Sequence, residues 1–114
     1  MVQPPIAYDD FDRVDMCVGK IVEARDFPEA RKPAYRLKID FGSEIGLKNS
    51  SAQLTRRYDK EDLIGRNIIA VVNFAPKHIA NFVSEVLVLG VADADGGIIL
   101  LTTENDAPLG SRVH

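Results

Sequence analysis

The sequence predicts an all-β fold in which five or six short strands form a small barrel and helix is scarce. Its 114 residues suffice for one domain with one core. Short apolar runs, some with the strand period of two, are separated by stretches rich in glycine, proline and charged residues. The clearest helical signal is a single turn at residues 59–65, with Asp59 as candidate N-cap and Gly65 as its stop.

The predicted strands follow one another along the chain. The first covers residues 14–24, and Gly19 lies where a β-bulge would bend it. The second covers residues 34–41, where apolar side chains fall on one face and charged ones on the other. Residues 49–58 are a polar segment that we expect to be partly helical. The remaining strands are predicted over residues 45–48, 67–73, 83–91 and 97–102, with a hairpin turn at 93–97.

A curved first strand and a short helix between the third and fourth strands are typical of a closed barrel of the OB type. An SH3-like barrel and a small sandwich are the alternatives. Residues 1–13 are expected to be an N-terminal extension with a helical turn at residues 8–12, and residues 14–114 to be the barrel domain.

The late strands are apolar on both faces. An antiparallel strand with one solvated face alternates apolar and polar residues, and residues 67–73, 83–91 and 97–102 do not. Their outer faces need a cover, and few elements of so short a chain are left to provide it. We therefore expect a homodimer, with an apolar ligand groove as the alternative for part of this surface.

Composition and charge favour an intracellular protein without a dominant nucleic-acid surface. The net charge is −3, whereas phosphate binding favours a basic face, although residues 31–66 are locally basic. The single cysteine, Cys17, excludes an internal disulfide. The chain shows neither a spanning apolar run nor the basic start and apolar run of a signal peptide. We expect a cytoplasmic location and no membrane insertion.

The residues that commonly do chemistry are few and scattered. The histidines are His78 and the terminal His114, and no His or Cys pair has metal-ligand spacing. Cys17 lies inside a predicted strand, where a core role is expected. The glycines form no phosphate loop. These observations predict a protein that is not an enzyme and needs no cofactor or metal.

Two binding hypotheses remain. One is an apolar peptide site, because the segment after the fourth strand is far more apolar than a solvated loop requires. Its candidate residues are Phe74, Pro76, Ile79, Phe82 and Val83. The alternative for these residues is a cap on the barrel or a dimer contact. The other hypothesis is a nucleic-acid face formed by Arg36, Lys38 and Lys48, which are otherwise the solvated half of their strands.

Three stretches of the chain resemble a known family. They are VGKIVEARDFPEARKPAYRLKIDFG (18–42), IGLKNSSAQLT (45–55) and NFAPKHIANFVSEVLVLG (73–90). In this order they resemble the CsaA-type export chaperones, which are built on an OB-fold tRNA-binding domain. The resemblance implies a five-stranded OB barrel, a homodimer and binding of unfolded or precursor polypeptides. It also implies tRNA and the export machinery as further partners.

The last stretch distinguishes the peptide-binding from the RNA-binding members of this family. The resemblance places Asn73, Ser84 and Glu85 on a polar floor of the binding site and retains Lys77 as a polar anchor. Alanine occupies positions 75 and 80, where the RNA-binding branch tends to be basic. Each lost phosphate contact weakens nucleic-acid binding. We therefore expect a polypeptide ligand first and tRNA second.

Overall fold

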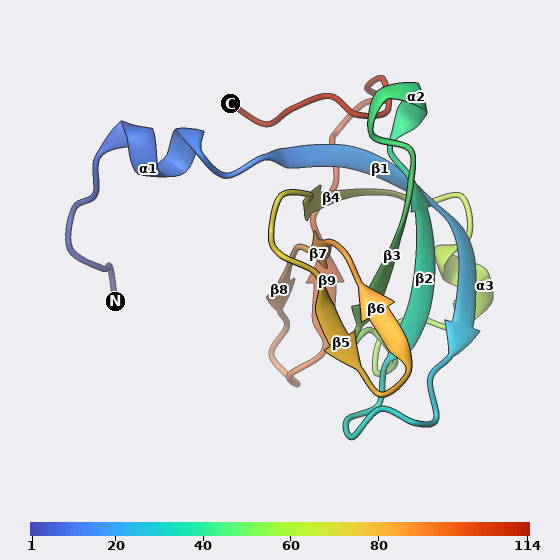
Figure 1. Cartoon of the computed structure of the whole chain (residues 1–114). Coiled ribbons are helices and arrows are strands. Elements are labelled where there is room, and N and C mark those ends of the chain that lie inside the picture. Colours follow the sequence, from blue (N-terminus) through green and yellow to red (C-terminus); the bar gives the residue numbers. More distant parts are fainter.

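The computed structural model describes residues 1–114 and confirms a mostly β, nearly closed OB-like barrel (Figure 1). One antiparallel sheet has the strand order β3-β2-β1-β4-β7. Its strands are β1 (Met16–Asp26), β2 (Tyr35–Asp40), β3 (Leu47–Ala52), β4 (Asn67–Val71) and β7 (Leu87–Val88). Two separate hairpins are β5 (Lys77–Ile79) with β6 (Phe82–Ser84), and β8 (Gly90–Ala92) with β9 (Ile98–Leu100). The short helices are α1 (Tyr8–Asp12), α2 (Gly42–Ile45) and α3 (Lys60–Leu63).

Strand β1 is long enough to pair with β4 in its first half and with β2 in its second. The predicted bulge at Gly19 is wrong in position, because the register shifts between Ile21 and Glu23. Gly19 is instead required by close packing. A Cβ at Gly19 would lie 2.6 Å from side-chain atoms of both Ile39 and Phe41. The core therefore approaches the β1 backbone directly at this residue.

The core fills the barrel from the inward face of β2, whose alternation is confirmed by its burial pattern. Leu37, Ile39 and the following Phe41 are at most 1% exposed, while Arg36 and Lys38 lie on the outer face. Helix α3 lies between β3 and β4, as predicted, and buries Leu63. The other core residues are Cys17, Ile21, Tyr35, Leu54, Ile68, Ala70, Val86 and Leu100.

The prediction for residues 45–58 is wrong in two places. Residues 42–45 form helix α2, and β3 extends to Ala52 through residues expected to be polar and partly helical. The polar composition was misleading because β3 contains a fully buried serine. Ser50 is 0% exposed and donates its hydroxyl hydrogen to the carbonyl of Val86 at 3.0 Å, so its burial leaves no polar group unpaired.

The single strand predicted over residues 83–91 is also wrong, because this segment is divided among β6, β7 and β8. The expected loop before it contains β5, which pairs with β6 across a two-residue turn at Ala80 and Asn81. Ala80 has a φ of +52°, a conformation uncommon for a residue with a side chain. The turn at residues 93–97 between β8 and β9 is confirmed.

The outer faces of the late strands are covered unequally. Residues 68–71 of β4 are all buried within one chain, so the expectation that this strand needs an external cover is wrong. The C-terminal segment provides an additional strand-like layer, with Val18 N–H donating to Ser111 and Val113 N–H donating to Met16. By contrast, Leu87 remains 49% exposed.

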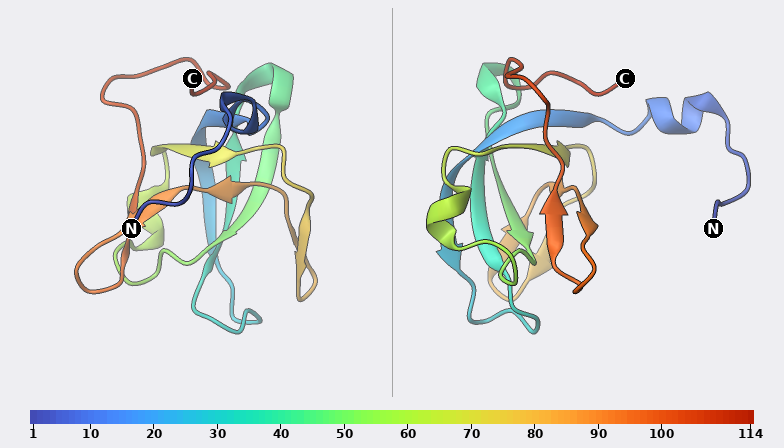
Figure 2. Two further views of the ribbon diagram at one scale, coloured as in Figure 1. Left: turned by 90° about the vertical axis from the view of Figure 1, so that its left-hand side faces the viewer. Right: turned by 180° about the vertical axis from the view of Figure 1, so that it is seen from behind.

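The N-terminal segment extends away from the barrel (Figure 2). Helix α1 lies on this arm, and its Ile6 and Tyr8 are 72% and 68% exposed. Asn73 anchors the base of the arm, since its side chain accepts the N–H of Asp15 at 2.9 Å and donates to the carbonyl of Arg13 at 2.8 Å. None of the helices has the length and apolar character needed to cross a bilayer.

Candidate functional site

A cavity of about 510 Å³ is lined by residues of both hairpins and of β7. Its walls come from four segments of the chain, of which the end of β3 is distant in sequence from the other three. The four segments are the end of β3 (Ser51, Ala52, Gln53, Leu54), the approach to and start of β5 (Phe74, Ala75, Lys77, Ile79), residues Ser84 to Val88, and the second hairpin (Gly90, Ile98). Most of these side chains are apolar, so the cavity is suited to apolar groups with a few polar contacts.

The structure distributes the predicted peptide-binding residues over three environments. Phe74 and Ile79 line the cavity, and Phe74 is 52% exposed at its rim. Pro76 is exposed beside the rim, and Val83 lies on the exposed side of β6. Phe82 does not line the cavity and contacts other parts of the barrel.

Phe82 attaches the β5–β6 hairpin to the outer face of β2. Its ring meets that of Phe27 edge-on, with centroids 5.4 Å apart. The guanidinium carbon of Arg36 lies 5.6 Å from the Phe27 centroid and 5.7 Å from the Phe82 centroid, within cation–π range. Arg36 Nε is buried and makes no hydrogen bond. Arg36 therefore has a packing role in addition to any contact with a ligand.

Ser84 and Glu85 close the barrel against β3 with their side chains. Ser84 Oγ accepts the N–H of Ser51 at 3.0 Å, and Glu85 Oε1 accepts the N–H of Asn49 at 2.9 Å. The Glu85 N–H also donates to the Asn49 carbonyl at 2.8 Å. These contacts replace part of a backbone ladder between β3 and residues 84–86. The same two residues line the cavity, so its polar wall is also the closure of the barrel.

The basic residues of the outer face are largely neutralised. Lys38 Nζ lies 3.9 Å from Glu23, and Lys48 Nζ lies 3.9 Å from Glu85. A hydrogen bond from Arg25 lowers the pKa of Glu23, which keeps this carboxylate charged beside Lys38. Exposed pairs of this kind are weak and contribute little to stability.

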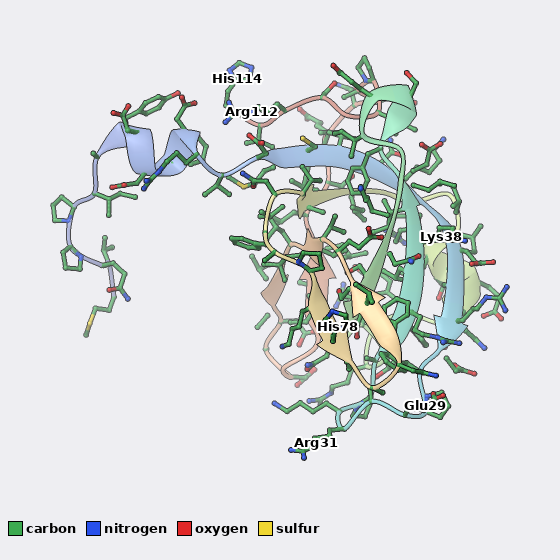
Figure 3. All side chains as sticks on the ribbon, in the orientation of Figure 1. Glu29, Arg31, Lys38, His78, Arg112 and His114 are labelled. Carbon is green, nitrogen blue, oxygen red and sulfur yellow. The ribbon has the colours of Figure 1, made fainter.

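On the outer face, Arg36 makes cation–π contacts in place of an ion pair, and further cations without an ion pair lie elsewhere. Arg31 is in the loop between β1 and β2, at the end of the barrel opposite Arg112 (Figure 3). Lys32 follows it in the same loop, and Lys77 lines the cavity on β5. Figure 3 also places His78 on the β5–β6 hairpin, away from Lys38 on the outer face. Of the predicted basic residues, Arg36 and Lys38 therefore share the outer face of β2, whereas Lys77 lies in the cavity wall.

Several lining residues were not predicted, among them Ser51, Gln53, Gly90 and Ile98. The signal that indicates the second hairpin is the doubly apolar pattern of residues 97–102, which places Ile98 and Leu100 toward the barrel and the cavity. The contribution of β3 has no comparable signal, because Ser51 and Gln53 belong to a segment of ordinary polar composition.

This combination of barrel and hairpins occurs in known proteins. The family model described as a putative tRNA-binding domain matches residues 16–112, nearly the whole chain. The chain belongs to the tRNA-binding-domain family. Among solved structures, it is similar to the CsaA chaperone protein of Picrophilus torridus, with 56% identity, a TM-score of 0.91 and coverage of 96% of this chain and 100% of that one.

Other members support the same placement. The chaperone CsaA of Bacillus anthracis is 49% identical with a TM-score of 0.91, covering 97% of this chain and 100% of that one. The resemblance to CsaA-type proteins within the tRNA-binding-domain family is thereby confirmed. The methionine–tRNA ligase of Chloroherpeton thalassium is 34% identical over 112 residues, which are 98% of this chain but 16% of that enzyme. The chain thus spans about one sixth of the curated relatives it matches.

Proposed function

We propose that the chain is a cytoplasmic molecular chaperone that binds unfolded or precursor polypeptides for export, without nucleotide hydrolysis. The observation that supports this most directly is the apolar cavity lined by both hairpins, with Phe74 and Ile79 in its wall. The likeness to two CsaA chaperones over nearly the full length of the chain supports the same assignment. Such a function needs a binding surface and no reacting group.

The proposed binding follows from the composition of the cavity wall. Apolar side chains of a nonnative polypeptide would contact Phe74, Ile79 and Leu87, and a buried apolar side chain contributes about 1.5–3 kcal/mol. Lys77 is the cation of the cavity without an ion pair, and it favours clients with acidic residues or free carbonyl groups nearby. Pro76, Phe82 and Val83 remain proposed as rim or support for this site.

The test is binding of a fluorescently labelled apolar peptide, followed by anisotropy. Ile79→Ser should weaken binding about tenfold, because it removes an apolar side chain from the cavity wall. Val22→Ser is the control, since Val22 is an exposed apolar residue of β1 that does not line the cavity. Equal affinity of both variants and the unmodified chain would place the site elsewhere.

We also propose that two copies associate. The support is the projecting arm, whose Ile6 and Tyr8 are exposed, together with Leu101 at 38% exposure. Apolar groups of this size on an extended arm are typical of an interaction surface. Sedimentation at micromolar concentration should give a mass near twice 12.6 kDa, and a mass near 12.6 kDa would contradict the dimer.

The second candidate function is a tRNA-binding module. The family model and the similarity to part of methionine–tRNA ligases favour it. The nucleic-acid face would consist of Arg36, Lys38 and Lys48. It would be extended by Lys77 and by the loop residues Arg31 and Lys32. Its polar anchors would be Asn73, Ser84 and Glu85. Binding of tRNA should then fall steeply with salt. Replacing Arg31 and Lys32 by glutamate should weaken it further, and no binding at low salt would exclude this function.

A further inference from the structure

One face of the β5–β6 hairpin both lines the cavity and carries the contact with the outer face of β2. In an antiparallel pair, opposite residues share a face, and side chains alternate between faces along each strand. The register places four side chains on this face of the hairpin, namely Lys77, Ile79, Phe82 and Ser84. Three of them line the cavity, and Phe82 packs against Phe27 and Arg36 instead. The opposite face carries His78 and Val83, which are both exposed.

The position of the hairpin tip depends on Phe82. The hairpin pairs with no strand of the five-stranded sheet, and its backbone is joined to β3 only beside its base, where the Glu85 N–H donates to the Asn49 carbonyl. At the other end, Phe82 and Ile79 are opposite one another next to the turn, with Cβ atoms about 5 Å apart as in any such pair. A displacement of Phe82 from β2 would therefore also displace Ile79 from the cavity wall.

Arg36 is the cation that holds Phe82. Its guanidinium lies within cation–π distance of both the Phe27 and Phe82 rings, and its buried Nε has no hydrogen-bond partner. Burying part of a charged group is costly unless other groups compensate, and here the two aromatic rings are the compensation. Phe27 is only 3% exposed, so it gives this cluster a fixed side. Separation of Phe82 from the cluster would remove one of the two rings from Arg36.

This role is particular to Arg36 among the arginines of the outer face. Arg25 is opposite Arg36 in the β1–β2 register and shares its face, but Arg25 is exposed and donates to Glu23 at 2.8 Å. On the other side, Ser51 of β3 is opposite Arg36 and lines the cavity. Arg36 itself does not line the cavity, although it lies only one strand from the cavity wall.

We propose that Arg36 is a positioning residue for polypeptide binding. It holds Phe82 on the outer face of β2, and the hairpin transmits this constraint across its turn to Ile79 in the cavity wall. The client polypeptide does not contact Arg36. The proposal rests on the proposed chaperone function and adds a residue outside the cavity on which peptide affinity depends. Every contact of the cluster lies within one chain, so the role is the same in a single copy and in a dimer.

The first test measures the affinity of a labelled apolar peptide without charged residues, by fluorescence anisotropy. Arg36→Met keeps a long unbranched side chain but removes the charge, and it should weaken binding about fivefold. Arg36→Lys restores a cation and should recover part of this loss. Arg25→Met is the matched control, because it removes a charge from the same face and should bind like the unmodified chain.

Two results of this test would overturn the positioning role. An equal loss in Arg25→Met would assign the effect to the charge of the whole face. An affinity of Arg36→Lys no better than that of Arg36→Met would mean that a cation beside the rings does not hold the hairpin. Circular dichroism checks that each variant folds, and Phe82→Leu, which alters the other side of the same contact, replaces Arg36→Met if that variant is unfolded.

The second test is a double-mutant cycle between Arg36 and Phe82. Phe82→Leu keeps an apolar side chain but removes the ring, and it should weaken peptide binding about as much as Arg36→Met. If Arg36 acts through Phe82, the double variant should bind no more weakly than either single variant. Additive losses would mean that Arg36 contacts the peptide directly, and would overturn the proposal.

The third test uses the reciprocity between peptide binding and the cluster. Both stabilise the same position of the hairpin, so the apolar peptide should slow hydrogen exchange of the β5 and β6 amides, and should slow it more in Arg36→Met than in the unmodified chain. An equal change in the two proteins would overturn the positioning role. A general loss of stability in Arg36→Met would not produce this difference, because it would affect the amides of β1 and β2 to the same extent.

Failure of the proposed function and failure of this proposal give different results. If the unmodified chain binds no apolar peptide, the chaperone function fails and the positioning role fails with it. If the unmodified chain, Arg36→Met and Phe82→Leu bind the peptide equally, the chaperone function stands and only the positioning role is overturned.

Discussion

The two hairpins beside the cavity are attached to the barrel in different ways. The β5–β6 hairpin is held mainly by side chains, through Ser84 against β3 and through Phe82 against Phe27 and Arg36. The β8–β9 hairpin is joined by backbone hydrogen bonds, since Leu89 N–H donates to the Ile69 carbonyl at 2.9 Å. One cavity wall therefore depends on side-chain identity and the other on the path of the backbone.

Because of this difference, side-chain substitutions are expected to affect the attachment of the two hairpins unequally. Substitutions in β5 and β6 are expected to alter how firmly that hairpin is held, whereas most side-chain changes in β8 and β9 should leave their backbone bonds intact. The exception in the second hairpin is a residue without a side chain, Gly90, because there the backbone of one strand lies against the other.

Gly90→Ala should have the largest effect on stability. The added Cβ would lie 2.4 Å from Ile98 Cγ2 and 2.7 Å from the Ile99 carbonyl oxygen, and the oxygen belongs to a backbone that cannot move freely. Overpacking of this kind costs about 1–3 kcal/mol. Urea denaturation of the whole chain measures the free energy of unfolding.

Val91→Thr is the control for Gly90→Ala. Val91 is 53% exposed in the same strand, and threonine keeps its branched shape, so the free energy of unfolding should change by less than about 0.5 kcal/mol. Gly90→Ala with unchanged stability would mean that the two strands of this hairpin can separate at little cost.

Phe82→Ala should have the next largest effect. Phe82 is only half-buried, and its replacement removes an aromatic pair and a cation–π contact, at a total cost of about 1–2 kcal/mol. Hydrogen exchange should show the loss of protection in β5 and β6 while β8 and β9 stay protected. Equal loss in both hairpins would contradict their independent attachment.

The sequence predicted the β8–β9 hairpin better than the β5–β6 hairpin for a physical reason. Residues 93–97 have clear turn chemistry, with Asp93 accepting the N–H groups of Asp95 and Gly97. The other turn places Ala80 at positive φ, where a glycine or asparagine would have been expected. Without that signal, the segment before residue 83 resembled an apolar loop.

Only some of the residues of the candidate site could be predicted from the sequence. Phe74 and Ile79 were found because large apolar residues are unusual in a solvated loop. Their neighbour Phe82 has the same chemistry but packs on β2, which depends on the orientation of the hairpin. Ser51 was missed because its part in the cavity wall arises from barrel closure, a contact between segments 33 residues apart.

Ser84→Ala should have a smaller effect than Phe82→Ala. The Ser51 N–H would lose its acceptor in a partly buried position, at a cost of about 1 kcal/mol. Ser84→Thr keeps the hydroxyl and serves as the control. Exchange of the Ser51 amide should accelerate in the alanine variant only, and unchanged exchange would show that water replaces the lost acceptor.

Acid should produce the smallest effect and should act on one hairpin only. Hydrogen bonds from the Asp95 and Gly97 amides and the charge of Arg57 lower the pKa of Asp93 from its usual value of 3.8. A lowered folded-state pKa means that this carboxylate stabilises the β8–β9 turn at all pH values above its usual pKa. That contribution is lost as the pH falls through the lowered value.

The β5–β6 turn, formed by Ala80 and Asn81, has no carboxylate and provides the internal comparison. In an NMR titration from about pH 6 to about pH 2, the Gly97 amide signal should shift with a midpoint below 3.8, while the Asn81 amide should not follow this transition. Asp93→Asn keeps an acceptor oxygen but should abolish the Gly97 transition. A Gly97 midpoint at or above 3.8 would mean that the charged carboxylate does not hold the turn, and that the second hairpin depends on its backbone bonds alone.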